Sequence, residues 1–307
     1  MPEVKLKPCF LTPKRVQPEY PLFIYLPGMD GTGELLRSQT AGLERSFDVR
    51  CLALPRKDLT TWDTLAKNVL DLIHAELEKS CQRAVYLCGE SFGGCLGMKV
   101  ATLAPQLFKR IILINPASSF HLRPWLNWAS QLTNLVHPCF YEVGALGLLP
   151  FLASLARLSR RDRHELLKTM RSVPPETINW RLSLIRNFWV DEEQLYRLTQ
   201  PVLLMAGARD RLLPSETEVR RLANILPNAQ TVILLDSGHA CLLEEGVNLY
   251  EILQRQNFLE STVPAVQDVR EKIDAAIAVS EQTAPIDGET FVNQILDRFG
   301  QQRQAEK

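Results

Sequence analysis

The pentapeptide Gly89-Glu90-Ser91-Phe92-Gly93 has the pattern G-x-S-x-G, which places a hydroxyl nucleophile between two glycines. An apolar run at 83–88 precedes it and predicts a buried strand, and the stretch 95–103 that follows predicts a helix. At such a strand-to-helix turn a serine takes a strained backbone conformation and presents its hydroxyl above the sheet edge. The alternative is an ordinary turn in which Ser91 caps the helix. The choice depends on whether the chain supplies partners for this serine.

A serine hydroxyl is a weak nucleophile and needs a general base. His239 follows the last predicted strand, in the sequence LLDSGH, where a loop can direct it toward the carboxyl edge of a sheet. The other four histidines lie in a predicted helix or in a predicted helical insertion. The alternative role for His239 is to cap the helix that follows. We predict that His239 is the base.

The base needs a carboxylate that orients it, between the serine and the histidine in the sequence and on a loop at a strand end. Asp210 fits, because it follows the predicted strand at 202–206. Asp236 is a second candidate, but it lies close to His239 in the sequence. Asp210 could instead pair on the surface with one of the arginines on either side of it. The order Ser91, Asp210, His239 is the chain order of α/β-hydrolases.

The negative oxygen of a tetrahedral intermediate needs preset N–H donors, an oxyanion hole. Phe92 supplies one backbone N–H, directly after the serine. The second is expected from the glycine-rich loop 28–33 that follows the predicted strand at 21–26, with Met29 as the first candidate and Asp30 as the second. The same loop could bind a phosphate at a helix N-terminus. It lacks, however, the Lys-Ser/Thr ending of a P-loop and the G-x-G-x-x-G spacing of a dinucleotide-binding loop.

Alternating strand and helix signals predict a parallel sheet with helices on both faces. Strands are expected at 21–26, 47–54, 83–88, 111–114, 202–206 and 231–235, and helices from 34 and at 62–77, 95–103, 216–226 and 240–256. From about 118 to 199 no strand is predicted, and leucines and tryptophans recur at helical intervals. This segment is the predicted lid, inserted before the strand that carries Asp210.

Composition restricts the class of protein. The 307 residues are 46% hydrophobic and carry no net charge, so a large core is possible and nucleic-acid binding is not expected. Seven scattered cysteines favour a reducing compartment, and no Cys/His spacing indicates a metal, so we predict neither a metal nor a cofactor. The longest apolar stretch, of about 14 residues, is too short to span a bilayer. A cytoplasmic protein is predicted.

The predicted lid is basic and rich in leucine. Between Arg157 and Arg186 it has eight basic and three acidic residues. Such a segment could rest on an anionic membrane surface, or it could be a solvated helix face; both remain open. Five apolar residues of the lid could line a site for an acyl chain or could pack within the lid: Leu148, Leu149, Phe151, Leu152 and Leu155.

The assembled motifs resemble a known family. Five segments carry the resemblance: Leu26-Pro27-Gly28-Met29-Asp30-Gly31-Thr32-Gly33, Ser91-Phe92-Gly93-Gly94, Asn115-Pro116-Ala117-Ser118-Ser119-Phe120, Pro174-Pro175-Glu176-Thr177-Ile178-Asn179-Trp180 and Asp236-Ser237-Gly238-His239. They are similar to segments of the hydrolase-like half of the plant plastid phytyl ester synthases. The similarity covers roughly residues 20–256. It implies an α/β-hydrolase fold, transfer of fatty acyl groups onto phytol and diacylglycerol, and Ser91, Asp210 and His239 as the catalytic triad.

The resemblance leaves the acceptor open. The plant proteins carry a second, acyltransferase-like half to which nothing here corresponds, so both water and an alcohol such as phytol stay candidates. We therefore predict a serine esterase, lipase or O-acyltransferase acting on acyl esters or thioesters. The alternative is a non-catalytic α/β-hydrolase fold used for binding or scaffolding.

Two domains are predicted. Residues 20–258 form the α/β-hydrolase domain, and residues 259–307 form a C-terminal extension of two short amphipathic helices. The apolar stripes of these two helices could pack on the chain itself or contact a partner. The oligomeric state is not indicated by the sequence.

Overall fold

The computed structural model describes residues 7–79, 83–122 and 150–259 of the 307. The chain divides into two units, Met1–Phe258 and Leu259–Lys307. The predicted helices of the second unit lie outside the described residues. So do residues 123–149 of the predicted lid.

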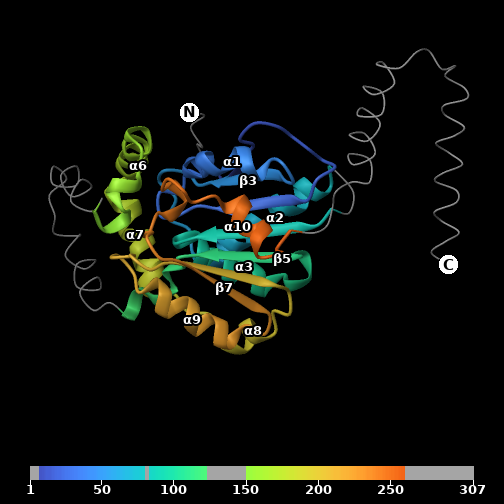
Figure 1. The fold of residues 1–307 in the computed structure, drawn as a ribbon. Helices are drawn as coiled ribbons and strands as arrows, with labels where there is room; N and C mark the ends of the chain where they lie inside the picture. The colour runs from blue at the N-terminus through green and yellow to red at the C-terminus, as the bar shows by residue number, and fades with distance from the viewer. Residues whose placement is uncertain (1–6, 80–82, 123–149, 260–307) are drawn as a thin grey trace, which may run out of the picture. The chain divides into compact units, whose positions relative to one another are not determined.

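A seven-stranded sheet forms the centre of the first unit (Figure 1). Its strands, in chain order, are β1 (Cys9–Leu11), β2 (Leu22–Leu26), β3 (Asp48–Ala53), β4 (Val85–Glu90), β5 (Arg110–Ile114), β6 (Val202–Gly207) and β7 (Ala229–Leu234). Their spatial order is β1-β3-β2-β4-β5-β6-β7, and only β1 runs antiparallel to its neighbour. Every residue of β2, β3, β4 and β6 is buried, as expected of parallel strands covered on both faces.

Helices connect the strands and cover the sheet (Figure 1). They are α1 (Arg37–Leu43), α2 (Trp62–Leu77), α3 (Phe92–Leu103), α9 (Ser215–Ile225) and α10 (Leu249–Arg255). Alternate residues of β2, namely Leu22, Ile24 and Leu26, share one hydrophobic core cluster with the buried faces of α2, α3 and α9. Helix α2 begins where Thr61 accepts a hydrogen bond from the Thr64 N–H, which is an ordinary N-terminal cap.

The connection from β2 changes direction within the sheet. The chain leaves β2 for β3 on one side and returns to β4 on the other side, so β2 lies between β3 and β4. The loops that follow β2 and β4 therefore diverge at the carboxyl edge. In open parallel sheets such a switch point forms the crevice in which ligands bind.

The described part of the predicted lid is helical. It contains α6 (Arg160–Ser172), α7 (Pro175–Arg186) and α8 (Glu192–Tyr196), and residues 150–199 include no strand. Ser159 caps α6 by accepting the Asp162 N–H, and Pro175 begins α7 at a position where its missing N–H costs nothing. Whether the segment acts as a lid remains a prediction.

Several predicted boundaries were wrong. The strand expected at 83–88 is β4, Val85–Glu90, and the helix expected at 95–103 begins at Phe92. The helix expected at 240–256 is divided into a 3-10 turn, Cys241–Leu243, and α10. The side chain of Asn248 caps the start of α10 by accepting the Glu251 N–H. The apolar spacing that predicted one helix runs through this cap without a break. Leu235, expected to end the last strand, lies beyond β7 and is 74% exposed.

Candidate active site

Ser91 stands on a strained turn between β4 and α3. Its backbone has φ 54° and ψ −113°, a conformation that residues with a side chain rarely adopt. The turn brings α3 against the neighbouring strand so closely that a Cβ on Gly93 would lie 2.0 Å from the Leu26 carbonyl oxygen. The sharp turn predicted from the G-x-S-x-G pattern is therefore present, and glycine is the only residue that fits at position 93.

Ser91, His239 and Asp210 lie in one hydrogen-bonded chain. The Ser91 Oγ is 2.8 Å from His239 Nε2, and His239 Nδ1 is 2.7 Å from Asp210 Oδ2. The three side chains come from the loops after β4, β7 and β6, which meet at the carboxyl edge of the sheet. His239 is 4% exposed, so the chain is largely withdrawn from water.

The surroundings of the carboxylate fix its charge. Asp210 Oδ1 accepts the N–H groups of Leu212 and Leu213, and Oδ2 accepts the Ser215 hydroxyl in addition to His239. Burial alone would raise the pKa of Asp210, but the charge and hydrogen bond of His239, together with the other donors, outweigh it and hold the pKa below 3.8.

The pKa of His239 is shifted in the opposite direction. Burial alone would lower the pKa of His239, but the charge of Asp210 and its hydrogen bond outweigh burial, and the pKa lies above 6.5. Asp210 thus favours the protonated imidazole, the form that results when His239 takes a proton.

The competing carboxylate lies elsewhere. Asp236 is exposed and forms an ion pair with Arg209 at 2.7 Å, with 60% of the Asp236 side chain accessible to solvent. The surface pairing considered for Asp210 is therefore made by Asp236 instead.

The loop after β2 passes beside the serine. A Cβ on Gly28 would lie 3.8 Å from Ser91 Cβ. Among the described residues, the N–H groups of Met29 and Phe92 have no hydrogen-bond partner. The Asp30 carboxylate is occupied by Thr32, which donates to it from its N–H at 2.9 Å and its hydroxyl at 2.5 Å. The N–H groups of Met29 and Phe92 are consequently free donors near Ser91.

A buried carboxyl group precedes the serine. Glu90 is 9% exposed and accepts a hydrogen bond from the hydroxyl of Tyr25 on the neighbouring strand. Burial raises the pKa of Glu90 to about 7, although the Tyr25 hydrogen bond and His239 act against the shift. The sequence motifs predict no role for Glu90, although its position beside Ser91 is a signal that could have indicated one.

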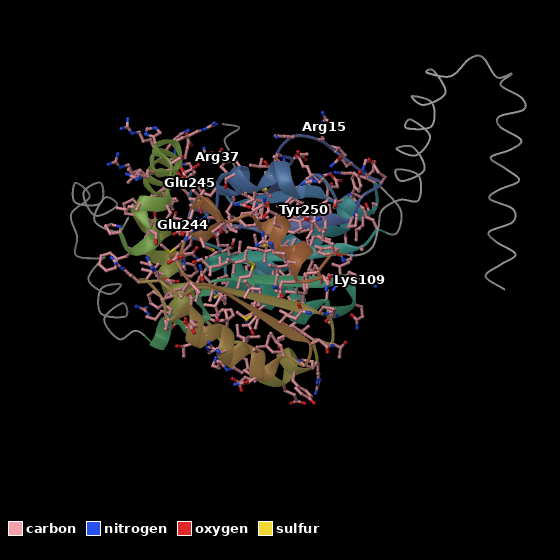
Figure 2. All side chains as sticks on the ribbon, in the orientation of Figure 1. Arg15, Arg37, Lys109, Glu244, Glu245 and Tyr250 are labelled. Carbon is pink, nitrogen blue, oxygen red and sulfur yellow. The ribbon has the colours of Figure 1, made fainter. Side chains whose placement is uncertain are left out.

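Glu244 connects the loop of His239 to the predicted lid. Its Oε1 accepts the N–H groups of Gly238 and Ser154, each at 2.9 Å, and the Ala240 N–H donates to the Leu152 carbonyl at 2.6 Å. Glu244 and its exposed neighbour Glu245 lie on the side of the molecule that carries α6 and α7 (Figure 2). The sequence shows a glutamate five residues after the predicted base, but nothing in its pattern marks Glu244 as buried.

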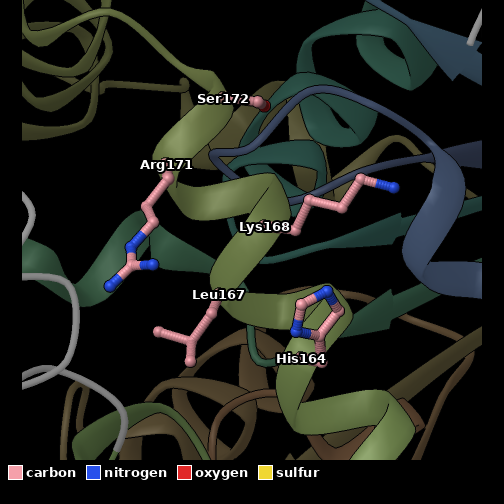
Figure 3. Close-up of a pocket in the computed structure, with 5 residues that line it drawn as sticks. All are labelled: His164, Leu167, Lys168, Arg171 and Ser172. Carbon is pink, nitrogen blue, oxygen red and sulfur yellow. The ribbon is translucent and has the colours of Figure 1, made fainter.

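The part of the chain that the structure describes contains no group of three or more His, Cys, Asp or Glu side chains that could hold a metal ion. A surface pocket of about 300 Å³ lies on α6, lined by His164, Leu167, Lys168, Arg171 and Ser172 (Figure 3). None of these residues takes part in the hydrogen-bonded chain of Ser91, His239 and Asp210. Leu148 and Leu149 of the predicted acyl-chain site lie outside the described residues; Phe151 is exposed, and Leu152 and Leu155 are half-buried.

Residues 55–246 match the family described as serine aminopeptidase, S33, over more than half of the chain. Phytyl ester synthase 1 of Arabidopsis thaliana is 31% identical over 256 residues, which cover 76% of this chain and 36% of that protein. Phytyl ester synthase 2 of the same plant is 26% identical over 302 residues, which cover 87% of this chain and 43% of that protein. The chain therefore spans less than half the length of these plant relatives.

Solved structures share the fold. A hydrolase from Oleispira antarctica superimposes with a TM-score of 0.63 at 17% identity, covering 81% of this chain and 93% of that one.

Proposed function

The chain belongs to the serine aminopeptidase S33 family of α/β-hydrolases, and from this premise we propose that it is a serine hydrolase or acyltransferase acting on acyl esters or thioesters through Ser91, His239 and Asp210. The observation that carries the proposal is the continuous hydrogen-bonded chain from Ser91 Oγ through the His239 ring to Asp210. The strained turn that presents Ser91, and the free N–H groups of Met29 and Phe92, support the same assignment.

In the first half of the reaction, Ser91 Oγ bonds to the acyl carbonyl carbon while its proton passes to His239 Nε2. Asp210 keeps the other ring nitrogen, Nδ1, protonated and stabilises the imidazolium. The N–H groups of Met29 and Phe92 hold the oxyanion. The intermediate collapses when the bond to the leaving alcohol or thiol breaks and His239 returns the proton to it, which leaves an acyl-Ser91 ester.

In the second half, water or an alcohol attacks the acyl-Ser91 carbonyl while His239 again accepts the proton. The bond to Ser91 Oγ breaks, and the proton returns to the serine. Water yields a free acid, and an alcohol yields a new ester. The curated relatives named as phytyl ester synthases favour a lipid acyl group and make phytol the first alcohol to test.

The test compares products rather than rates alone. Purified protein is incubated with a long-chain acyl donor, with and without phytol, and mass spectrometry quantifies free fatty acid and phytyl ester. Ser91→Ala is the matched control. Phytyl ester that requires Ser91 supports an acyltransferase, and free acid alone supports an esterase or lipase. Absence of any Ser91-dependent product from several donors would overturn the proposal in favour of a binding or scaffolding protein.

We propose further that α6 makes peripheral contact with an anionic membrane surface. Four basic side chains of α6 and its histidine are exposed, three of the five around the pocket of Figure 3: Arg160, Arg161, His164, Lys168 and Arg171. Asp162 and Glu165 of this helix pair with Arg37 at 3.0 and 3.2 Å, and Glu165 also contacts Lys168 at 3.5 Å, so the two carboxylates offset only part of the positive charge of α6. Within the described residues, no helix is long and apolar enough to cross a bilayer.

Vesicle sedimentation tests this contact. Binding to vesicles that contain phosphatidylglycerol, weakened by salt and by the double variant Lys168→Glu/Arg171→Glu, is the expected result. Lys67→Glu, an exposed change on α2, is the control. Equal partitioning onto neutral and anionic vesicles would count against the proposal.

A further inference from the structure

Arg181 is a buried arginine on α7 that reaches the loop after β2. It is 1% exposed, and its Nη1 donates to the Met29 carbonyl at 2.7 Å. Nη2 makes a longer contact of 3.5 Å with the Pro55 carbonyl. The guanidinium carbon also stands 6.0 Å from the centre of the Phe92 ring, within cation–π range. One side chain thus contacts both residues whose N–H groups form the proposed oxyanion hole.

The guanidinium is held at an energetic cost. The carboxylates of Asp30 and Asp58 lie near enough to act on its charge, but among the described residues neither forms a direct ion pair with it, and its buried Nε has no hydrogen-bond partner. Burying a cation without a directly paired carboxylate costs desolvation free energy. The contacts of the guanidinium with the Met29 carbonyl and the Phe92 ring act against this cost.

The loop after β2 is shaped around Arg181. Gly31 has φ 66°, and a Cβ at that position would lie 2.6 Å from Arg181 Nη1. The glycine thus removes the atom that would displace the guanidinium. The same loop contributes Gly28, which lies against Ser91, so a shift of Arg181 would move backbone that borders the nucleophile.

Two tryptophans fix the helix on either side of this contact. Trp62 stacks on Phe92 with ring centres 4.5 Å apart and donates its Nε1–H to the Leu184 carbonyl at 2.9 Å. Trp180 donates its Nε1–H to the Thr60 carbonyl at 2.9 Å. Because α7 is anchored at both points, Arg181 has a defined position.

We propose that Arg181 is a positioning residue of the oxyanion hole: by holding the Met29 carbonyl and the Phe92 ring, it orients their N–H groups toward Ser91. The inserted segment between β5 and β6 thereby completes a site otherwise built from the sheet edge. This inference rests on the proposed function, because an oxyanion hole has a purpose only if Ser91 attacks a carbonyl.

The experiment separates transition-state stabilisation from stability and from substrate binding. Wild type, Arg181→Gln and Arg181→Lys are compared for kcat and KM on a p-nitrophenyl ester, for Tm, and for inhibition by an alkyl trifluoromethyl ketone and by the matching methyl ketone. The trifluoromethyl ketone adds to the serine and places an oxyanion in the hole, whereas the methyl ketone reports binding of the ground state.

The expected result for Arg181→Gln is a fall in kcat of roughly 10- to 100-fold with KM nearly unchanged, smaller than the loss on deleting a donor outright. Inhibition by the trifluoromethyl ketone should weaken by a similar factor, and inhibition by the methyl ketone should not. Arg181→Lys keeps the charge but not the planar fork of the guanidinium, so its kcat and its inhibition by the trifluoromethyl ketone should lie between those of the wild type and Arg181→Gln. Arg186→Gln, on the same helix, is the control and should behave as wild type.

The outcomes are distinguishable. If the wild type shows turnover that requires Ser91 but the folded Arg181 variants keep the wild-type kcat, or lose affinity for both ketones equally, the assignment of Arg181 is wrong and the proposed function stands. If the wild type shows no turnover that requires Ser91, both fall together. Arg181→Lys, which retains the buried charge, supplies the comparison if Arg181→Gln does not fold.

Discussion

The side chain of Asn115 holds the main chain of His239: its Nδ2 donates to the His239 carbonyl at 2.6 Å. Its Oδ1 accepts the N–H of Gly207, the last residue of β6, at 2.9 Å. Asn115 itself follows β5, is fully buried and has φ 43°. One amide therefore ties the ends of two strands to the loop that carries the proposed base.

Replacing this amide should cost both stability and activity. Asn115→Ala leaves the buried Gly207 N–H and His239 carbonyl without a partner, at about 1–3 kcal/mol for each group. We expect the free energy of unfolding in urea to fall by about 2–5 kcal/mol, with kcat reduced and KM less affected, since the base is displaced.

The strain of a positive φ must be separated from the lost hydrogen bonds. Asn257→Ala serves for this, because Asn257 is also an asparagine at positive φ (51°) but is exposed and lies at the end of α10. It should reproduce the backbone cost and leave kcat unchanged. Equal losses of stability in the two variants would show that the contacts of Asn115 contribute nothing.

The fold could be predicted because its signals are local. The apolar runs that became β2, β3, β4, β5 and β6 have the period and length of strands buried on both faces, and the predicted α/β-hydrolase fold is confirmed. The failures were confined to the ends of elements. The end of the last strand and the division of the helix at 240–256 depend on tertiary contacts and on a cap inside an apolar pattern.

The supporting residues of the site could not be predicted in the same way. Ser91, Asp210 and His239 stand at strand ends, where the chain order and the parallel topology indicate that they meet. Arg181 is one of eight basic residues in a segment whose helices have no sheet to fix them, and nothing in its neighbourhood marks it as buried. Contacts over 152 residues, such as Arg181 to Met29, are decided by packing and not by sequence pattern.

The raised pKa of His239 predicts the acidic limb of the pH profile. The base must be neutral to accept the Ser91 proton, so kcat/KM should fall as the pH drops through a pKa above 6.5. Asp210→Asn removes the charge that raises this pKa. We expect the midpoint to move to lower pH and kcat to drop by about 10⁴-fold.

Asp236→Asn is the matched control for this experiment, since Asp236 was the second candidate for the orienting carboxylate but is exposed and paired with Arg209. It should leave both the midpoint and kcat unchanged. A loss of activity in Asp236→Asn together with a normal Asp210→Asn would reverse the assignment of the orienting carboxylate.

Glu90 should make the stability of the wild type fall with rising pH. Its pKa is raised by burial from 4.5 to about 7, so the folded state retains a proton that the unfolded state has lost across this window. The stabilising contribution is complete below pH 4.5 and is lost as the pH rises through about 7. In Glu90→Gln this position does not titrate. The unfolding free energy of the variant minus that of the wild type should therefore rise by about 3 kcal/mol between pH 4.5 and 8.

Urea unfolding at several pH values measures this difference. Glu19→Gln removes an exposed carboxylate far from the site and is the control for a change of net charge. If the difference between Glu90→Gln and the wild type does not vary with pH, the carboxyl group of Glu90 is not held neutral by its surroundings.

The link between Glu244 and the loop of His239 predicts a defect that its neighbour does not share. Glu244→Ala leaves the N–H groups of Gly238 and Ser154 without their acceptor, so we expect a loss of about 2–5 kcal/mol in unfolding free energy and a lower kcat. Glu245→Ala, one residue on and exposed, should change neither, because Glu245 contacts Arg157 only through its main chain. Thermal unfolding and ester hydrolysis on both variants measure the effect, and equal behaviour of the two would contradict a role for Glu244 in holding the histidine loop.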